Sequence, residues 1–241
     1  MSEVQNKIEV KQSTIATIKK LSQINQTLKL LADSDVLLSK SESNVMFCSA
    51  PIEDKFPRDF HIYDLREFLS VVNIIEDPIL DFSNDKFVIV RSRDGKQKLR
   101  YLESAAQFVT SYTSKEPKLD SVDFEIDVSE AQFKAVITAA NTMSLEYIGF
   151  VGDGDKVSIV AFNKNNGDEV ETNTFSIELG DSDTDQPFRM FYKLETHKID
   201  VLQGEGSLKF AVSSRLVSKV DTESKKTFFI TMDKKSTFGS D

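Results

Sequence analysis

The residue types that most often carry catalysis or bind metal ions are scarce in this chain. Its 241 residues include two histidines, His61 and His197, and a single cysteine, Cys48. A zinc site with the usual four ligands needs more histidine and cysteine than this. Cys48 lies in an apolar, strand-like stretch, so we expect a buried thiol rather than a nucleophile. Neither the glycine-rich phosphate-binding motifs nor the Gly-x-Ser-x-Gly pattern occurs in the sequence.

Carboxylates are numerous, but their spacing does not single out a catalytic pair. The run Asp181–Asp185 looks like the start of a calcium-binding loop. Gln186 and Tyr192 stand where such a loop needs glycine and glutamate, so we interpret the run as an acidic surface turn. We therefore expect no catalytic residue, metal ion or cofactor, and a small hydrolase using its carboxylates is the least favoured interpretation.

Basic residues at helical positions are the more informative group. Lys19, Lys20, Arg66, Lys134 and Lys198 all fall on segments with helical periodicity, and Arg66 and Lys134 each lie about 100° from the apolar stripe of their helix. A solvated helix face is the ordinary explanation for such residues. Their recurrence in both halves of the chain favours a shared role.

A long internal repeat organises the rest of the sequence. The stretch Phe60–Val72 reads as the end of a strand followed by a short helix, because the apolar period changes from two residues to the spacing of one helical face. A related stretch, Phe188–Leu194, returns about 129 residues later. Tyr63-Asp64-Leu65 then falls opposite Tyr192-Lys193-Leu194.

Each half is predicted to run strand, helix, several strands, short helix and three strands, which makes an α+β protein with two copies of one topology. The longer helices are expected at 12–25 and 129–143, where Ser129 and Gln132 form a capping-box pattern. Residues 1–110 form the predicted N-terminal domain, 111–121 a connector and 122–241 the C-terminal domain.

The net charge of the chain limits how it could bind nucleic acid. The net charge is −9, with 16 basic and 17 acidic residues in 1–116 and 14 and 22 in 117–241. A simple nucleic-acid-binding domain is usually basic, so binding to DNA would require charge sorted by face. The single cysteine, the polar N-terminus and the lack of a long apolar run predict a cytoplasmic protein that does not span a membrane.

Three stretches carry a further signal: Ile62-Tyr63-Asp64-Leu65 with Phe68-Leu69, the helix end from Lys19 to Asn25, and Phe175–Asp181. Together they resemble the DNA sliding clamps of T-even-type bacteriophages, which are related in fold to proliferating cell nuclear antigen. The likeness covers nearly the whole chain. It implies a DNA-clamp fold with two similar domains, each with antiparallel sheets and two helices, that assembles as a homotrimeric ring.

The resemblance also implies partners and site residues. The ring would encircle double-stranded DNA without reading its sequence and tether the replicative DNA polymerase in the cytoplasm of the infected bacterial host. A clamp loader ATPase and the late-transcription sigma-like factor and co-activator of such phages are further expected partners. The residues expected to face DNA are Lys11, Lys19, Lys20, Arg66, Lys134, Lys193 and Lys198. The subunit interface would use Lys98, Leu99, Tyr101, Phe175 and Ile177. A partner pocket would be lined by Phe108, Tyr112, Phe228 and Ile230.

One feature departs from the resemblance. The polar side of the helix at 129–143 carries Thr138, Asn141 and Thr142, with only Lys134 well placed for DNA. The second domain is therefore expected to contact DNA less than the first. The alternative interpretation is an oligomeric, β-rich phage structural protein with no DNA-tethering role, which would not require cations on the helices.

Overall fold

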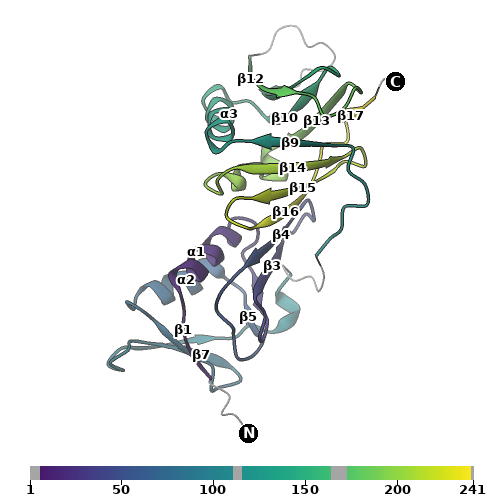
Figure 1. The fold of residues 1–241 in the computed structure, drawn as a ribbon. Coiled ribbons are helices and arrows are strands. Elements are labelled where there is room, and N and C mark those ends of the chain that lie inside the picture. Colours follow the sequence, from purple (N-terminus) through teal and green to yellow (C-terminus); the bar gives the residue numbers. More distant parts are fainter. Residues whose placement is uncertain (1–5, 111–115, 164–172, 240–241) are drawn as a thin grey trace. The chain divides into compact units, whose positions relative to one another are not determined.

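The computed structural model describes residues 6–110, 116–163 and 173–239 (Figure 1). The chain divides into two compact units, residues 1–116 and 117–241, each of which has its own core. This division falls inside the stretch predicted as the connector, of which residues 111–115 lie outside the described part. The limits of the two domains stay a prediction.

Unit 1 is built from short antiparallel strands and two α-helices. Its strands are β1 (Lys7–Glu9), β2 (Leu28–Leu30), β3 (Val36–Lys40), β4 (Met46–Pro51), β5 (Phe60–Ile62), β6 (Ile79–Asp81), β7 (Phe87–Arg91) and β8 (Lys98–Leu102). Its helices are α1 (Gln12–Leu21), α2 (Leu65–Asn73) and a 3-10 turn, η1 (Ala106–Phe108). One sheet has the order β1-β6-β7-β8, while β2 pairs with β5 and β3 with β4.

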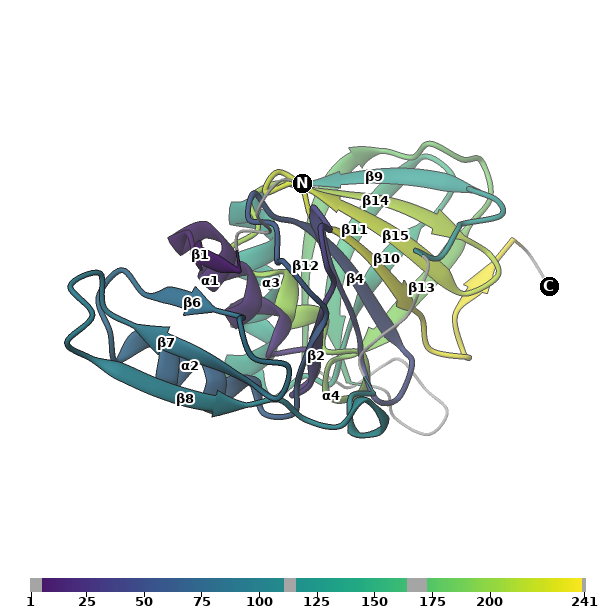
Figure 2. The ribbon, with the colours of Figure 1, turned by 90° about the horizontal axis from the view of Figure 1, so that it is seen from below.

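The helices of unit 1 form because their apolar residues share one face. Leu65, Phe68, Leu69 and Val72 of α2 are buried, and α2 lies behind β7 and β8 in Figure 2. Tyr101 of β8 fills the space between strand and helix, with its ring 5.2 Å from that of Phe68. Helix α1 contacts α2, so the two helices lie side by side on the core (Figure 1).

Unit 2 repeats this order with longer strands. Its strands are β9 (Phe124–Val128), β10 (Tyr147–Gly152), β11 (Lys156–Phe162), β12 (Thr174–Asp181), β13 (Phe188–Lys193), β14 (Leu208–Ser213), β15 (Val217–Thr222), β16 (Thr227–Thr231) and β17 (Thr237–Phe238). Its helices are α3 (Glu130–Met143), α4 (Leu194–His197) and a 3-10 turn, η2 (Ile199–Leu202). One antiparallel sheet has the order β12-β11-β10-β13-β17, and in a second sheet β14 lies between β9 and β15, with β16 next to β15.

Helix α3 begins at the predicted capping box. The Ser129 hydroxyl accepts a hydrogen bond from the Gln132 backbone N–H at 3.3 Å, and the Gln132 side chain accepts one from the Ser129 N–H at 3.0 Å. Its apolar stripe packs on β10, β11 and β12. Gly149 lets β10 approach β13 closely, because a Cβ at this position would lie 2.2 Å from the Met190 carbonyl oxygen.

The two-copy α+β order predicted from the repeat is confirmed. Four details differ. Helix α1 ends at Leu21 rather than at residue 25, and the expected second short helix is broken at Lys198, whose left-handed backbone (φ 49°) separates α4 from η2. The sequence patterns also missed β1, which pairs with β6, and β17, which pairs with β13. Among the described residues, no helix is both long and apolar enough to cross a membrane.

Candidate nucleic-acid interface

Helix α1 is the most cationic of the described helices. Between Gln12 and Leu21 its charged residues are Lys19 and Lys20, both in the last turn, where a positive charge also favours the helix dipole. The Lys19 side chain is exposed, whereas Lys20 is half-buried. Lys11 precedes the helix and forms an ion pair with Glu53, whose carboxylate raises the pKa of the Lys11 amine. Part of the charge of Lys11 is therefore balanced within the chain.

Arg66 of α2 occupies a less favourable position for a cation. Asp64 caps this helix, since its carboxylate accepts hydrogen bonds from the Arg66 and Glu67 backbone N–H groups at 2.9 and 3.0 Å. The Arg66 side chain is exposed in the first turn and makes no ion pair within the described residues. A positive charge at a helix N-terminus opposes the dipole, so local helix stability does not explain this arginine.

Unit 2 offers fewer exposed cations on its described helices. Lys134 of α3 is exposed, and the Thr138 and Thr142 hydroxyls on the same side of the helix donate hydrogen bonds to carbonyl groups one turn earlier. Lys198 is exposed at the end of α4. Lys193 is half-buried at the end of β13, with its ammonium 3.8 Å from the Glu146 carboxylate. These positions agree with the expectation of weaker DNA contact from the second half, which itself stays a prediction.

The structure thus places Lys19, Lys20 and Arg66 on two neighbouring helices, with Lys11 directly before the first of them. Helices α2 and α3 each carry one base and one acid, so of the three longer helices only α1 has an excess of positive charge. No group of histidine, cysteine, aspartate and glutamate side chains suited to a metal ion occurs among the described residues.

The predicted subunit-interface residues lie on two strands at the ends of sheets. Strand β8 ends the sheet of unit 1, and β12 ends the five-stranded sheet of unit 2. Lys98 is exposed, and Leu99, Phe175 and Ile177 are half-buried. The Tyr101 side chain is only 7% exposed, and its hydroxyl donates a hydrogen bond to the Asp64 carbonyl at 3.2 Å. It is therefore a core residue of unit 1, and its side chain cannot reach a neighbouring subunit.

Burial tests whether the residues predicted to line the partner pocket are accessible. Phe228 and Ile230 of β16 are both fully buried, so the prediction that they line an open pocket is wrong. Phe229 between them is buried as well, so the three central side chains of β16 all lie in the interior. Phe108 is 54% exposed, with its ring 6.5 Å from that of the exposed Tyr63. Tyr112 lies outside the described residues.

The two histidines have structural partners. The His61 ring nitrogen Nδ1 lies 2.8 Å from a carboxylate oxygen of Glu103, whose other oxygen accepts a hydrogen bond from the Arg58 guanidinium at 2.6 Å. This network fastens the segment after β8 to β5. The His197 Nδ1 accepts a hydrogen bond from the Lys193 backbone N–H at 2.9 Å and fixes the turn between β13 and α4. Cys48 is fully buried in β4, as predicted.

Sequence reasoning missed a basic cluster at the hairpin between β7 and β8. It consists of Arg91, Arg93, Lys96, Lys98 and Arg100, with Asp94 as the only acid between them. The hairpin turns at Gly95, which adopts a positive φ of 71°. The signal was present in the sequence, but the balance of −1 over residues 1–116 concealed it.

Comparison with known proteins relates this geometry to one family. No protein-family model matches the chain. The sliding clamp of Vibrio phage KVP40 is 31% identical over 190 residues, which are 78% of this chain and 84% of that protein. The sliding clamp of Enterobacteria phage T4 is 22% identical over 202 residues, which are 80% of this chain and 83% of that protein.

Solved structures show the same fold at much lower sequence identity. The crystal structure of proliferating cell nuclear antigen from Entamoeba histolytica matches with a TM-score of 0.69 and 13% identity, over 95% of this chain and 98% of that chain. The predicted fold class is thereby confirmed, as is the resemblance drawn from the sequence. The chain belongs to the DNA sliding clamps of T4-type bacteriophages, which are related in fold to proliferating cell nuclear antigen.

Proposed function

We propose that three copies of this chain form a ring around duplex DNA and tether the replicative DNA polymerase of the phage. Sliding clamps are not catalytic, so the ring acts by retention: a closed ring cannot leave DNA sideways, and the polymerase bound to it stays at the primer end. A clamp loader ATPase opens the ring, and a late-transcription sigma-like factor and its co-activator use the same ring in the cytoplasm of the infected host.

The observation that carries the proposal is the pair of exposed cations on neighbouring helices of unit 1. Lys19 and Arg66 are exposed on α1 and α2, and neither makes an ion pair within the described residues. Helix α1 has no acidic residue. Lysine and arginine attract the phosphate backbone independently of sequence and in a salt-sensitive way. Lys134 and Lys198 give unit 2 a weaker version of the same surface.

The two end strands supply the contact that closes the ring. Strand β8 of one copy adds to β12 of the next, with Lys98 and Leu99 on one side and Phe175 and Ile177 on the other. An unpaired strand edge readily pairs with another chain, and a head-to-tail contact of this kind closes into a ring when the rotation is right. Phe108 and the exposed Tyr63 beside it are the residues we retain for partner docking.

The test combines charge-reversal variants with a comparison of linear and closed circular DNA. The Lys19→Glu/Arg66→Glu variant should remain a trimer but should be retained on circular DNA less well than the wild type, and it should support shorter synthesis by its polymerase. Lys234→Glu, which reverses an exposed lysine outside the helices, serves as the control. Wild-type protein that is retained equally on linear DNA with free ends and on closed circles would refute encirclement. Unchanged retention of the double variant would refute the assigned DNA face.

A further inference from the structure

The sheet formed by β1, β6, β7 and β8 has one side turned toward the helices of unit 1. Tyr101 of β8 lies on that side, since its ring packs 5.2 Å from that of Phe68 on α2. Side chains alternate along a strand, so the residues on either side of Tyr101 point away from α2, which lies behind this sheet in Figure 2. On β7 and β8 the outward side chains, which we call the outer face, are those of Phe87, Ile89, Arg91, Lys98, Arg100 and Leu102.

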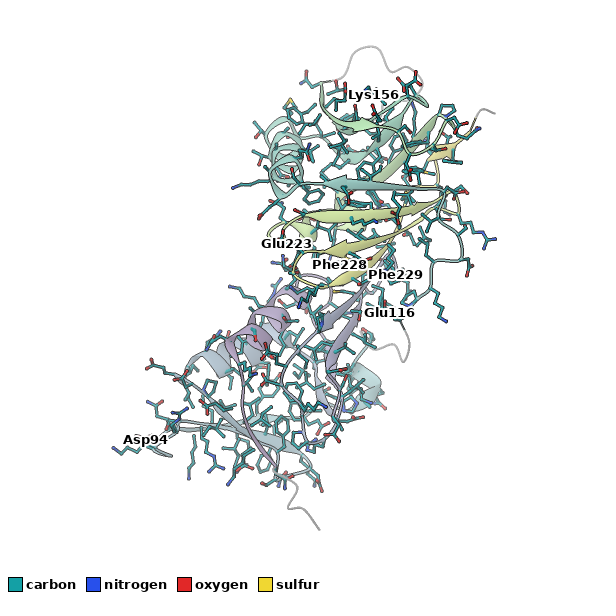
Figure 3. All side chains as sticks on the ribbon, in the orientation of Figure 1. Asp94, Glu116, Lys156, Glu223, Phe228 and Phe229 are labelled. Atoms are coloured by element: carbon teal, nitrogen blue, oxygen red, sulfur yellow. The ribbon has the colours of Figure 1, made fainter. Side chains whose placement is uncertain are left out.

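The acids next to the outer face already have basic partners. Asp81 of the neighbouring strand β6 forms an ion pair with Arg91 and lies 4.0 Å from Lys7. Asp94, which marks the tip of the β7–β8 hairpin in Figure 3, lies 3.7 Å from Lys96. Both carboxylates are therefore balanced by bases other than the two that follow on β8.

Two cations of the outer face are unpaired. Lys98 and Arg100 form no ion pair within the described residues. The Arg100 guanidinium lies 4.5 Å from the centre of the Phe87 ring, and stacking on an aromatic ring holds its orientation. Because the whole chain carries a net charge of −9, a cationic region of this kind attracts acidic molecules that the rest of the surface repels.

An exposed apolar side chain continues the same row. Leu102 follows Lys98 and Arg100 at the next outward position of β8 and is 67% exposed. In the register of the sheet it stands opposite Phe87, which is half-buried. Burying a leucine stabilises a contact with another protein, whereas a phosphate backbone offers it no apolar surface. The outer face therefore favours a partner that presents carboxylates beside an apolar residue.

The spacing of this row fits one side of an α-helix. Outward residues of a strand are about 7 Å apart, and residues four apart on a helix are separated by about 6 Å along its axis. A helix also satisfies its own backbone hydrogen bonds. An extended segment lying on the outer face would leave its backbone groups unpaired, because the face presents side chains.

We propose that the outer face of β7 and β8 docks an acidic amphipathic helix of a partner protein. Two carboxylates, four positions apart on that helix, pair with Lys98 and Arg100, and an apolar side chain one turn further packs on Leu102. These residues all belong to one copy of the chain, so the inference does not depend on the proposed ring. Arg100 and Leu102 are also distinct from the residues expected at the subunit contact, which uses the edge of β8 rather than its face.

A synthetic helical peptide serves as the probe. It is alanine-rich, about 15 residues long so that it can form a helix, and carries two glutamates four positions apart and a leucine four positions further on. Its control peptide has the same composition, with the glutamates and the leucine on different sides of the helix. Fluorescence anisotropy should show that the wild-type chain binds the first peptide about tenfold more tightly than the second, and added NaCl should weaken this binding.

Variants of the chain identify the surface that binds the peptide. Arg100→Glu and Leu102→Ser should each weaken binding on the order of tenfold, with circular dichroism to confirm that both variants fold. Lys225→Glu reverses an exposed lysine in unit 2. It makes the same change in net charge as Arg100→Glu and should leave binding of the peptide unaltered.

Three results would overturn the inference. They are equal binding of the two peptides, binding that survives either Arg100→Glu or Leu102→Ser, and displacement of the peptide by a short DNA duplex, which would make the outer face a nucleic-acid site. Sedimentation velocity of the wild type measures assembly separately, so a failure of the ring and a failure of this docking site are told apart.

Discussion

Replacing Arg66 by glutamine should make the protein more stable and a poorer DNA clamp. Arg66 lies in the first turn of α2, which is capped by Asp64, and its exposed side chain has no ion pair within the described residues. Its positive charge faces the positive end of the helix dipole. Glutamine keeps a similar length and helix propensity and removes only the charge. The capping hydrogen bonds come from backbone N–H groups, so the substitution leaves them in place.

The sizes of the two effects can be estimated separately. A charge near a helix end contributes about 0.3–1 kcal/mol, so Arg66→Gln should raise the free energy of unfolding by that amount. For a chain of this length, the corresponding rise in Tm is roughly 1–4 °C. Removing one cation that neutralises a phosphate should reduce the slope of log affinity against log salt by about 0.9. Stability and DNA retention should therefore move in opposite directions.

Glu67→Gln is the matched control, because it neutralises the neighbouring exposed residue in the same turn. It removes an acid that favours the dipole, so it should lower Tm and leave DNA binding unchanged or strengthened. Thermal melts followed by circular dichroism report the stability of both variants, and anisotropy of a labelled duplex across a NaCl series reports the salt slope. A lower Tm for Arg66→Gln would refute the dipole argument, and equal salt slopes for the two variants would refute the assignment of Arg66 to the DNA face.

Two further predictions concern the core of unit 2. Burial lowers the pKa of His197, whose Nδ1 must stay unprotonated to accept the hydrogen bond from the Lys193 backbone N–H. Below about pH 6.5 the unfolded state therefore binds more protons than the folded state. The free energy of unfolding should fall as the pH is lowered through that value. A plot of Tm against pH should show this decline, and it should be shallower in His197→Asn; equal slopes would exclude His197 as its cause. Gly149→Ala should lower the free energy of unfolding by about 1–3 kcal/mol, because its methyl group would lie 2.2 Å from the Met190 carbonyl oxygen. A denaturant melt close to that of the wild type would mean that β10 and β13 move apart at little cost.

Local patterns in the sequence were sufficient for most of the fold. The capping box located the start of α3, and the repeat at Phe60–Val72 revealed the two-copy topology. The strands that escaped prediction, β1 and β17, are three and two residues long and exist through pairing with β6 and β13. Strands this short leave almost no periodic signal, since their stability comes from partners distant in the sequence.

The candidate site was harder to predict because burial and ion pairing are tertiary properties. The sequence could place Lys11 and Arg66 near helix starts. It could not show that Lys11 pairs with Glu53, whereas Arg66 makes no ion pair within the described part of the chain. Nor could it separate Phe228, which is fully buried, from Phe108, which is 54% exposed. Aromatic residues look alike in a sequence until the elements that pack against them are known.

The modest charge of the helices fits the proposed mechanism better than a strongly basic surface would. Helices α2 and α3 each balance one cation with one acid, whereas α1 carries an excess. Every additional phosphate contact makes binding tighter, and tight contacts would have to break at each step along DNA. A ring that holds DNA by its closure needs only enough attraction to keep the duplex centred. We therefore expect that adding lysines at Thr138 and Asn141, both exposed on α3, would increase DNA affinity and slow sliding, measured as the diffusion coefficient of single rings on stretched DNA.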